Sequence, residues 1–383
     1  MPRPLYKGAE PPKPAAGFHK GLWFERFFNY SDPTFKEVGD GDKEQAITQV
    51  SGAAGSDPEI ERFASRQIKL INSLGGQFQI FSLDWHFVTG MGNEHPVENG
   101  FLWHPTLGTP YLPGSAVKGL LRSWLEQNLE PGTQRQELLH QWFGSKGKKP
   151  EEQQHENQAG DLIFHDAIPV GATRVRADIM TPHMGKWYEK GGEGSPANSP
   201  DTIPADWHNP IPVPFLVTTR ASFLFAVSPR TGAMNDGIDD VMKFLGNALE
   251  ELGAGAKTAA GYGSMQRDGK QEAIFAQRLQ SQQEQQQQQA FEASLSPAER
   301  AMYQVRQQLE ADRRNGNKNA GGDCKRQLNL MVDQAATEQW SKAELEELCQ
   351  LALDILNHHG PAPKKGKGKE LMQKIRRLQE QAI

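Results

Sequence analysis

The sequence lacks the features that would cross-link the chain, anchor it in a membrane or bind a metal through paired cysteines. Its 383 residues include only two cysteines, Cys324 and Cys349, which argues against a disulfide framework and against a cysteine zinc site. No run approaches the roughly 18 apolar residues of a membrane span. The first residues also lack the charged-then-apolar order of a signal peptide. We therefore expect a cytoplasmic protein with free thiols, no cofactor and no membrane partner.

An excess of positive charge is missing as well. The 42 Lys and Arg side chains are outnumbered by 47 Asp and Glu, which gives a formal net charge of −5. Any binding of nucleic acid must then come from local basic patches rather than from the overall field of the protein. The histidines show no spacing like His-Glu-x-x-His, and no Walker loop is present because Gly119 is followed by Leu120. The sequence predicts no metal site and no catalytic residue.

A Pro-Gly turn that leads directly into an amphipathic helix is the most informative stretch of the chain. Apolar residues between 117 and 125 recur at helical spacing. With Ser115 as the N-cap, Lys118 falls at the third helical position, where Glu or Gln is usual. This cation, together with Gly114 and Arg122, favours a site for an anion such as a phosphate. The alternative is a core helix whose lysine extends into solvent.

A second anion-binding segment is the glycine-rich stretch 253–263. It fits neither G-x-G-x-x-G nor a Walker loop, because Lys257 follows an alanine. Its glycines, among them Gly255 and Gly261, would leave backbone N–H groups available to an anion beside Lys257 and Thr258. The stretch implies binding without any chemical step.

A long proline-rich insertion, residues 172–212, separates two predicted strands. Loops of this length without regular structure are usually functional. Its side chains combine a cation with stacking groups, as in proteins that bind single strands, and the residues concerned are His183, Lys186, Trp187 and Tyr188. An ordinary surface hairpin is the alternative.

The periodicity of the central region predicts an α+β fold. Strands are expected at 78–88, 161–168, 215–227 and 262–267, with a bulge near Ile80 and Phe81 where the alternation changes phase. Helices are expected at 57–74, 115–129 and 238–252. From the first strand onward the order is β-α-β-β-α-β, that of the ferredoxin-like, RRM-type unit, a common scaffold for single-stranded RNA.

Two flanking regions differ in composition from this core. Residues 1–56 form a predicted N-terminal arm with an aromatic island at 22–28, which should pack on its own domain or on a neighbouring subunit. Residues 57–271 form the predicted RRM-type domain with its insertion. Residues 272–383 form a Gln-rich, mainly helical extension that ends in a basic stretch at 364–377. That stretch could lie along a phosphate backbone, although a solubilising tail is the alternative.

Five ordered blocks of the chain resemble the RAMP superfamily of CRISPR systems, and in particular the subunits of the Cmr complex, the type III-B RNA-guided effector. The blocks are residues 90–100, 110–122, 178–183, 206–216 and 252–263. The resemblance covers about residues 78 to 267. It implies a RAMP domain with a ferredoxin-like βαββαβ core, a thumb-like insertion and, beyond it, a C-terminal helical extension.

The resemblance also implies a function. The chain would be a non-catalytic subunit at the end of the complex's helical backbone, near the 3′ part of the CRISPR RNA. It would contact the backbone RAMP subunit and the small-filament subunit. By carry-over, Gly114, Ser115, Lys118 and Arg122 would hold guide phosphates. The adjacent wall would consist of Gly255, Lys257, Thr258 and Gly261, and residues 180–189 would reach over the duplex of guide and target RNA.

Two other functions compete with this one. The first is a RAMP endoribonuclease that acts on guide precursors or on target RNA, with His183, His104 or Asp178 as acid-base or metal-binding groups. The second is a protein-assembly cap that works through the aromatic arm and the helical tail. We expect the RNA-binding subunit, because an unpaired lysine at a helix start, glycine-rich turns and an aromatic-basic loop all favour anion and base binding.

Overall fold

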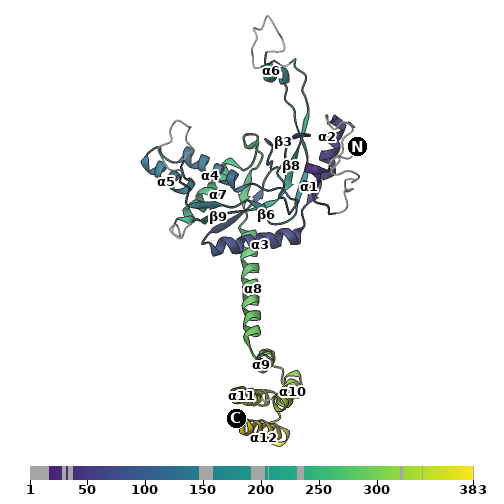
Figure 1. The fold of residues 1–383 in the computed structure, drawn as a ribbon, viewed down its shortest axis with the longest axis vertical. Coiled ribbons are helices and arrows are strands. Elements are labelled where there is room, and N and C mark those ends of the chain that lie inside the picture. Colours follow the sequence, from purple (N-terminus) through teal and green to yellow (C-terminus); the bar gives the residue numbers. More distant parts are fainter. Residues whose placement is uncertain are drawn as a thin grey trace. The chain divides into compact units, whose positions relative to one another are not determined.

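The structure is a computed structural model that describes residues 17–27, 32, 38–145, 158–190, 203–205, 207–230, 237–319, 322–338 and 340–382. The chain divides into two compact units, Met1–Gln277 and Arg278–Ile383. Figure 1 shows the ribbon coloured along the sequence. Each unit has a hydrophobic core of its own. The arm and the central region of the sequence therefore belong to one unit.

The centre of the first unit is an antiparallel sheet with the strand order β10-β2-β9-β5, and β6 also pairs with β9. The strands are β2 (Gln77–Leu83), β5 (Leu162–Phe164), β6 (Ile168–Pro169), β9 (Ser222–Pro229) and β10 (Met265–Arg267). The helices α4 (Gly114–Asn128) and α7 (Ile238–Leu252) pack together over one face. Helix α3 (Asp57–Ser73) crosses the sheet on the other side (Figure 1). This mixed helix and antiparallel-sheet architecture confirms the predicted α+β class.

The predicted bulge in the first strand is wrong, because both faces of the sheet are buried. The change of phase near Ile80 and Phe81 is not a bulge, because β2 pairs with β9 without interruption from Gln77↔Val227 to Ser82↔Ser222. Phe81 belongs to the core below α4 and α7, and Ile80, which is also fully buried, points to the opposite face. A strand covered by helices on both sides loses its polar alternation.

Two strand predictions also differ from the structure, and one helix was not predicted. The first strand ends at Leu83 rather than at residue 88, and Phe87 bridges to Thr218 instead. The segment predicted as one strand at 215–227 is two strands, β8 (Val213–Arg220) and β9, which separate at Ala221 and enter different sheets. Helix α5 (Thr133–Phe143) was not predicted, because its polar face dominates its short sequence.

The predicted insertion contains a strand of its own. Strand β7 (Thr173–Met180) pairs with β8 and with β1 (Gly52–Ala54) in a second sheet. The short helix α6 (Gly185–Lys190) lies beyond the end of β7 (Figure 1). A small hairpin, β3 (Glu94–His95) and β4 (Glu98–Asn99), lies within the predicted loop before α4.

The aromatic island of the arm packs on its own domain, one of the two outcomes expected. Trp23 and Phe24 of α1 (Lys20–Arg26) are buried in a cluster with Val175 of β7 and Leu216 of β8. The cluster also includes residues of α2 (Asp40–Val50). Phe28, the last aromatic of the island, lies outside the described residues.

The second unit is a set of amphipathic helices. Helix α8 (Gly269–Ser294) contains the boundary between the units. The remaining helices share one core and confirm the predicted helical tail; they are α9 (Pro297–Arg314), α10 (Asp323–Thr337), α11 (Lys342–His359) and α12 (Gly366–Gln381). In the basic stretch at the end, Lys374 donates a hydrogen bond to Asp333 at 2.5 Å.

Candidate nucleic-acid interface

Three of the sequence blocks meet at one groove of the first unit. This groove, which we call the glycine groove, has a volume of about 540 Å³ and is lined by the loop 89–92, by one side of α4 and by residues of the segment 252–258. The α4 side consists of Pro113, Ala116, Leu120, Ser123 and Gln127. Among the described residues that line the groove there is no lysine or arginine. Its polar surface is therefore mostly backbone and hydroxyl groups.

The start of α4 is held by a protein carboxylate. The N-cap is Pro113, with no side-chain cap hydrogen bond, so the predicted Ser115 cap is wrong. Lys118 consequently falls at the fifth helical position and not at the third. The N–H of Gly114 donates to Oδ1 of Asp166 at 2.7 Å. A Cβ on Gly114 would lie 2.2 Å from the carbonyl oxygen of Phe164, so this close approach requires glycine.

The two cations of α4 point away from the glycine groove. Lys118 donates from Nζ to the carbonyl of Phe143 at 2.8 Å, where α5 ends. A cation at this end of a helix interacts favourably with the helix dipole. Arg122 pairs with Glu126 at 3.1 Å, and its guanidinium lies 5.9 Å from the ring centre of Phe143. The structure therefore does not bring Lys118 and Arg122 together with the glycine-rich wall.

The glycine-rich segment packs against Val88, in the stretch between β2 and the β3-β4 hairpin. Gly255 has φ +91°, and a Cβ there would lie 2.1 Å from the carbonyl oxygen of Val88. Lys257 adopts the left-handed conformation with φ +60°, and its Nζ lies 5.5 Å from the ring centre of Phe215. Gly261 is also left-handed, with φ +88° and open space around its α-carbon.

Free backbone donors remain in this segment. The N–H groups of Ala260, Gly261 and Tyr262 are engaged by the turn that follows Lys257. Within the part of the chain that the structure describes, no acceptor is found for the N–H groups of Thr258 and Ala259. Thr258 lines the glycine groove, as Gly255 does. Backbone N–H groups of this kind are what an anion site in such a turn would use, and anion binding here stays a prediction.

A polar cluster around Asp178, which the sequence named only as an alternative catalytic residue, lies next to this loop. Asp178 of β7 accepts a hydrogen bond from the hydroxyl of Tyr262 at 2.9 Å and lies 3.4 Å from Nδ1 of His86. Burial alone would raise the pKa of Asp178, but the hydrogen bonds from the Ile179 N–H and from Tyr262, together with His86, lower it below its usual value. Burial, followed by the bond to Asp178, raises the pKa of Tyr262.

An aromatic platform extends from the same cluster. Trp85 is 55% exposed and stacks on His86, with ring centres 4.3 Å apart at an angle of 20°. A sequence signal existed for these residues, since Trp85 and His86 lie within the predicted strand 78–88 and Tyr262 belongs to the glycine-rich block. Their proximity depends on the pairing of segments distant in sequence, which no local pattern reveals.

The region beyond β7 carries the predicted stacking residues. His183 is exposed, Tyr188 is 65% exposed, and the rings of Trp187 and Tyr188 lie 5.0 Å apart. The side chain of Lys186 lies outside what the structure describes. These residues share no contact with the glycine groove among the described residues.

The three residues considered for catalysis have separate surroundings. His104 is buried between Phe63 and Tyr111, and burial lowers its pKa. Asp178 contacts His86 and Tyr262, while His183 is exposed beyond the end of β7. No contact between described residues joins the three, so the structure does not assemble them into one site.

The sequence relationships agree with the blocks that build this interface. The family model of the RAMP superfamily matches residues 84–266. This range contains the glycine groove, the Asp178 cluster and both strands of the β7-β8 pair. Residues 84–266 are therefore similar to proteins of the RAMP superfamily, in agreement with the resemblance of the five blocks, and we refer to this range as the RAMP domain.

The chain is also similar to one particular subunit of a CRISPR system. It is 28% identical over 244 residues to the CRISPR system Cmr subunit Cmr6 of Pyrococcus furiosus, a match that covers 51% of this chain and 69% of the relative. The crystal structure of that Cmr6 aligns with 52% of this chain and 99% of its own, at 26% identity and a TM-score of 0.29. A cryo-EM structure of the type III-B Cmr-beta complex bound to cognate target RNA contains a chain with 19% identity and a TM-score of 0.41, covering 63% of this chain and 76% of that one.

No helix in the described ranges combines the length and the apolar character that a membrane crossing requires.

Proposed function

We propose that this chain is a non-catalytic RNA-binding subunit of a type III-B CRISPR effector, the counterpart of Cmr6. In this role it holds the 3′ part of the CRISPR RNA at the end of the backbone, contacts the backbone RAMP subunit and the small-filament subunit, and acts in the cytoplasm in antiviral defence. The relationship to Cmr6 and the RAMP domain at 84–266 support the assignment. The strand order β10-β2-β9-β5 below α4 and α7 supports a ferredoxin-like, RRM-type core.

The glycine groove is the observation that carries the RNA-binding role. It joins three separate sequence blocks, and among the described residues no acceptor is found for the N–H groups of Thr258 and Ala259 next to it. Lys257 lies over Phe215 next to these donors and adds positive charge. Trp85 offers an exposed ring on which a base can stack. We infer that the guide passes over this loop, with backbone donors and one lysine binding a phosphate.

The first experiment is to co-express the chain with its genomic neighbours and to purify it through a tag on the chain. The nucleic acid that co-purifies is then extracted and sequenced. Repeat-derived RNA of defined length in a multi-subunit particle supports the effector-subunit assignment. A particle without RNA would favour the assembly-cap role. A protein that is recovered alone, free of RNA, contradicts the proposed function.

A second experiment tests individual residues. Lys257→Ala is expected to weaken guide binding and to reduce the slope of log affinity against log salt by about 1. Lys243→Ala is the matched control, because Lys243 is an exposed cation of α7. Lys118→Ala and Arg122→Ala test the predicted phosphate contacts on α4. Because both side chains already have protein partners, we expect a smaller change in the salt slope than for Lys257.

The same purified protein tests the endoribonuclease alternative. The Asp178 cluster is the observation in its favour, since it places a carboxylate, an imidazole and a phenol together. Metal-dependent cleavage of RNA by the isolated chain, lost in Asp178→Asn, would support the enzyme. Unchanged RNA after incubation with Mg²⁺ or Mn²⁺ agrees with the non-catalytic role.

A further inference from the structure

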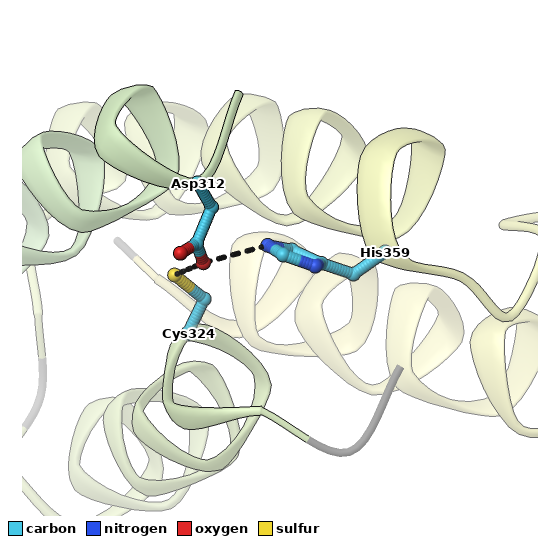
Figure 2. A group of neighbouring side chains, drawn as sticks. All are labelled: Asp312, Cys324 and His359. Atoms are coloured by element: carbon cyan, nitrogen blue, oxygen red, sulfur yellow. Dashed lines mark hydrogen bonds and ion pairs between the residues drawn. The ribbon is translucent and has the colours of Figure 1, made fainter. Parts of the chain in front are cut away.

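Three potential metal ligands from three different helices meet inside the C-terminal unit. Asp312 lies near the end of α9, Cys324 near the start of α10 and His359 at the end of α11, and all three residues are buried. Figure 2 shows their side chains converging on the Asp312 carboxylate. Sγ of Cys324 is 3.4 Å from Oδ2 of Asp312, and Nε2 of His359 is 3.1 Å from the same oxygen.

The histidine of this cluster has unsatisfied polar atoms. The side chain of His359 is only 2% exposed. Although Nε2 lies near Asp312, neither ring nitrogen has a hydrogen-bond partner among the described residues. A buried polar group without a partner is costly, and such groups are rare in folded proteins. The ring faces the carboxylate at ion-pair distance without the geometry of a hydrogen bond to it, which is the orientation of a ligand directed at a shared point.

The spacing of the donor atoms suits a tetrahedral ion. With usual zinc bond lengths, a tetrahedral site separates sulfur and oxygen ligands by about 3.6 Å and nitrogen and oxygen ligands by about 3.4 Å. The observed separations of 3.4 and 3.1 Å are close to these values. All three donor atoms lie within 4.8 Å of one another. Small movements of the side chains would allow one ion to coordinate all three donor atoms.

Hydrogen bonds also hold the Asp312 carboxylate in a fixed orientation, as is usual for a metal ligand. Its other oxygen, Oδ1, accepts hydrogen bonds from Gln308 at 3.1 Å and from Asn317 at 3.2 Å. Such outer contacts fix a ligating group and strengthen metal binding. A donor set of one sulfur, one imidazole nitrogen and one carboxylate oxygen favours Zn²⁺ over Mg²⁺ or Ca²⁺, which prefer oxygen ligands.

We propose that Asp312, Cys324 and His359 form a Zn²⁺ site that ties α9, α10 and α11 together, with water as the fourth ligand. On binding, the Cys324 thiol releases its proton to solvent and the sulfur coordinates the ion as a thiolate. The sequence argued against a cysteine zinc site because it contains only two cysteines. It could not show that one cysteine lies next to a histidine and an aspartate from other helices.

The test uses the full chain, reduced, stripped with a chelator and titrated with Zn²⁺ in competition with a chromophoric chelator. We expect about one Zn²⁺ per chain and a higher melting temperature when it is bound. Cys324→Ser retains a hydroxyl that can donate to Asp312, so it should fold, yet it should bind Zn²⁺ at least about ten-fold more weakly. His359→Gln should show a similar loss. Cys349→Ser, at the other free cysteine, is the matched control and should bind like the unmodified chain.

A second readout keeps the proposal testable if a variant does not fold. Co²⁺ bound to the unmodified chain should give a thiolate-to-cobalt charge-transfer band that is lost in Cys324→Ser and retained in Cys349→Ser. The proposal is overturned if the unmodified chain binds Zn²⁺ no better than Cys324→Ser, or if Co²⁺ gives no thiolate band. In either case the three residues form a hydrogen-bonded network without metal.

Discussion

Different interactions stabilise the helix starts of α4, in the first unit, and of α9 and α11, in the C-terminal unit. In the C-terminal unit, helices α9 and α11 each begin with a complete capping box, Ser296 with Glu299 and Ser341 with Glu344. Helix α4 of the RAMP domain has no side-chain cap, and its first N–H is bound by Asp166, 52 residues further along the chain. Local sequence therefore specifies the starts of α9 and α11, whereas a long-range contact fixes the start of α4 at the glycine groove.

The same difference separates the candidate RNA-binding region from the rest of the chain. The features that point to RNA are close backbone approaches and N–H groups without an acceptor among the described residues, and they occur where distant segments meet. We expect substitutions to separate the two units by their effects, with the largest losses at backbone contacts of the RAMP domain. Hydrogen exchange measured by mass spectrometry can assign each loss of stability to a unit.

The largest effect is expected at Gly255. Gly255→Ala introduces left-handed strain and also places a Cβ 2.1 Å from the carbonyl oxygen of Val88. Together these should lower the free energy of unfolding of the RAMP domain by roughly 3 kcal/mol or more. Gly261→Ala is the matched control, since Gly261 has a similar φ but open space around it. It should cost only about 1 to 2 kcal/mol. Equal losses in the two variants would show that the approach to Val88 is unimportant.

A smaller effect is expected at Asp166. Asp166→Ala removes the charged acceptor of the Gly114 N–H and leaves the first turn of α4 without a partner. The expected loss is about 1 to 2 kcal/mol, to be measured by denaturant unfolding. Asp166→Asn keeps an acceptor oxygen without the charge and should recover part of this loss. Faster exchange of the amides at the start of α4 should accompany the alanine variant only.

In the C-terminal unit, Ser341→Ala removes the local cap of α11. Its hydroxyl accepts a hydrogen bond from the Glu344 N–H, so the variant should cost about 1 kcal/mol. Ser341→Asp retains an acceptor at the N-cap and should be nearly as stable as the unmodified chain. The increase in exchange should be confined to residues after 278. An equal increase in the RAMP domain would mean that the two units do not unfold separately.

The sequence predicted most of the helices and the order of the elements, but not the assembly of the candidate interface. Apolar spacing predicted the first and last residues of α3 and α7 almost correctly, because each helix buries one face. It could not reveal that Ala221 divides one β-rich run between two sheets, or that Pro113 precedes the first turn of α4.

The functional residues show the same limit. Lys118 was predicted from its position near a helix start, yet its partner is the end of α5, a helix that the sequence did not reveal. Trp85 and His86 were not singled out at all, since their relation to Asp178 depends on the pairing of distant strands. The glycine-rich segment was recognised because its backbone needs glycine for local reasons, at φ values such as that of Gly255.

The smallest effect is expected from the pH dependence of Asp178. Its folded-state pKa lies below its ordinary value, which is about 3.9 in an unfolded chain. The ionised form is thus favoured by folding, and its contribution is fully present above about pH 4 and lost as the pH falls through the folded pKa. Asp178→Asn cannot titrate, so the RAMP domain of this variant should lose less stability between about pH 4 and pH 2. At neutral pH the variant should cost about 1 kcal/mol, because Tyr262 keeps an amide acceptor in place of a carboxylate. Identical acid unfolding of the variant and the unmodified chain would mean that the hydrogen bonds to Asp178 do not hold the glycine-rich loop against β7.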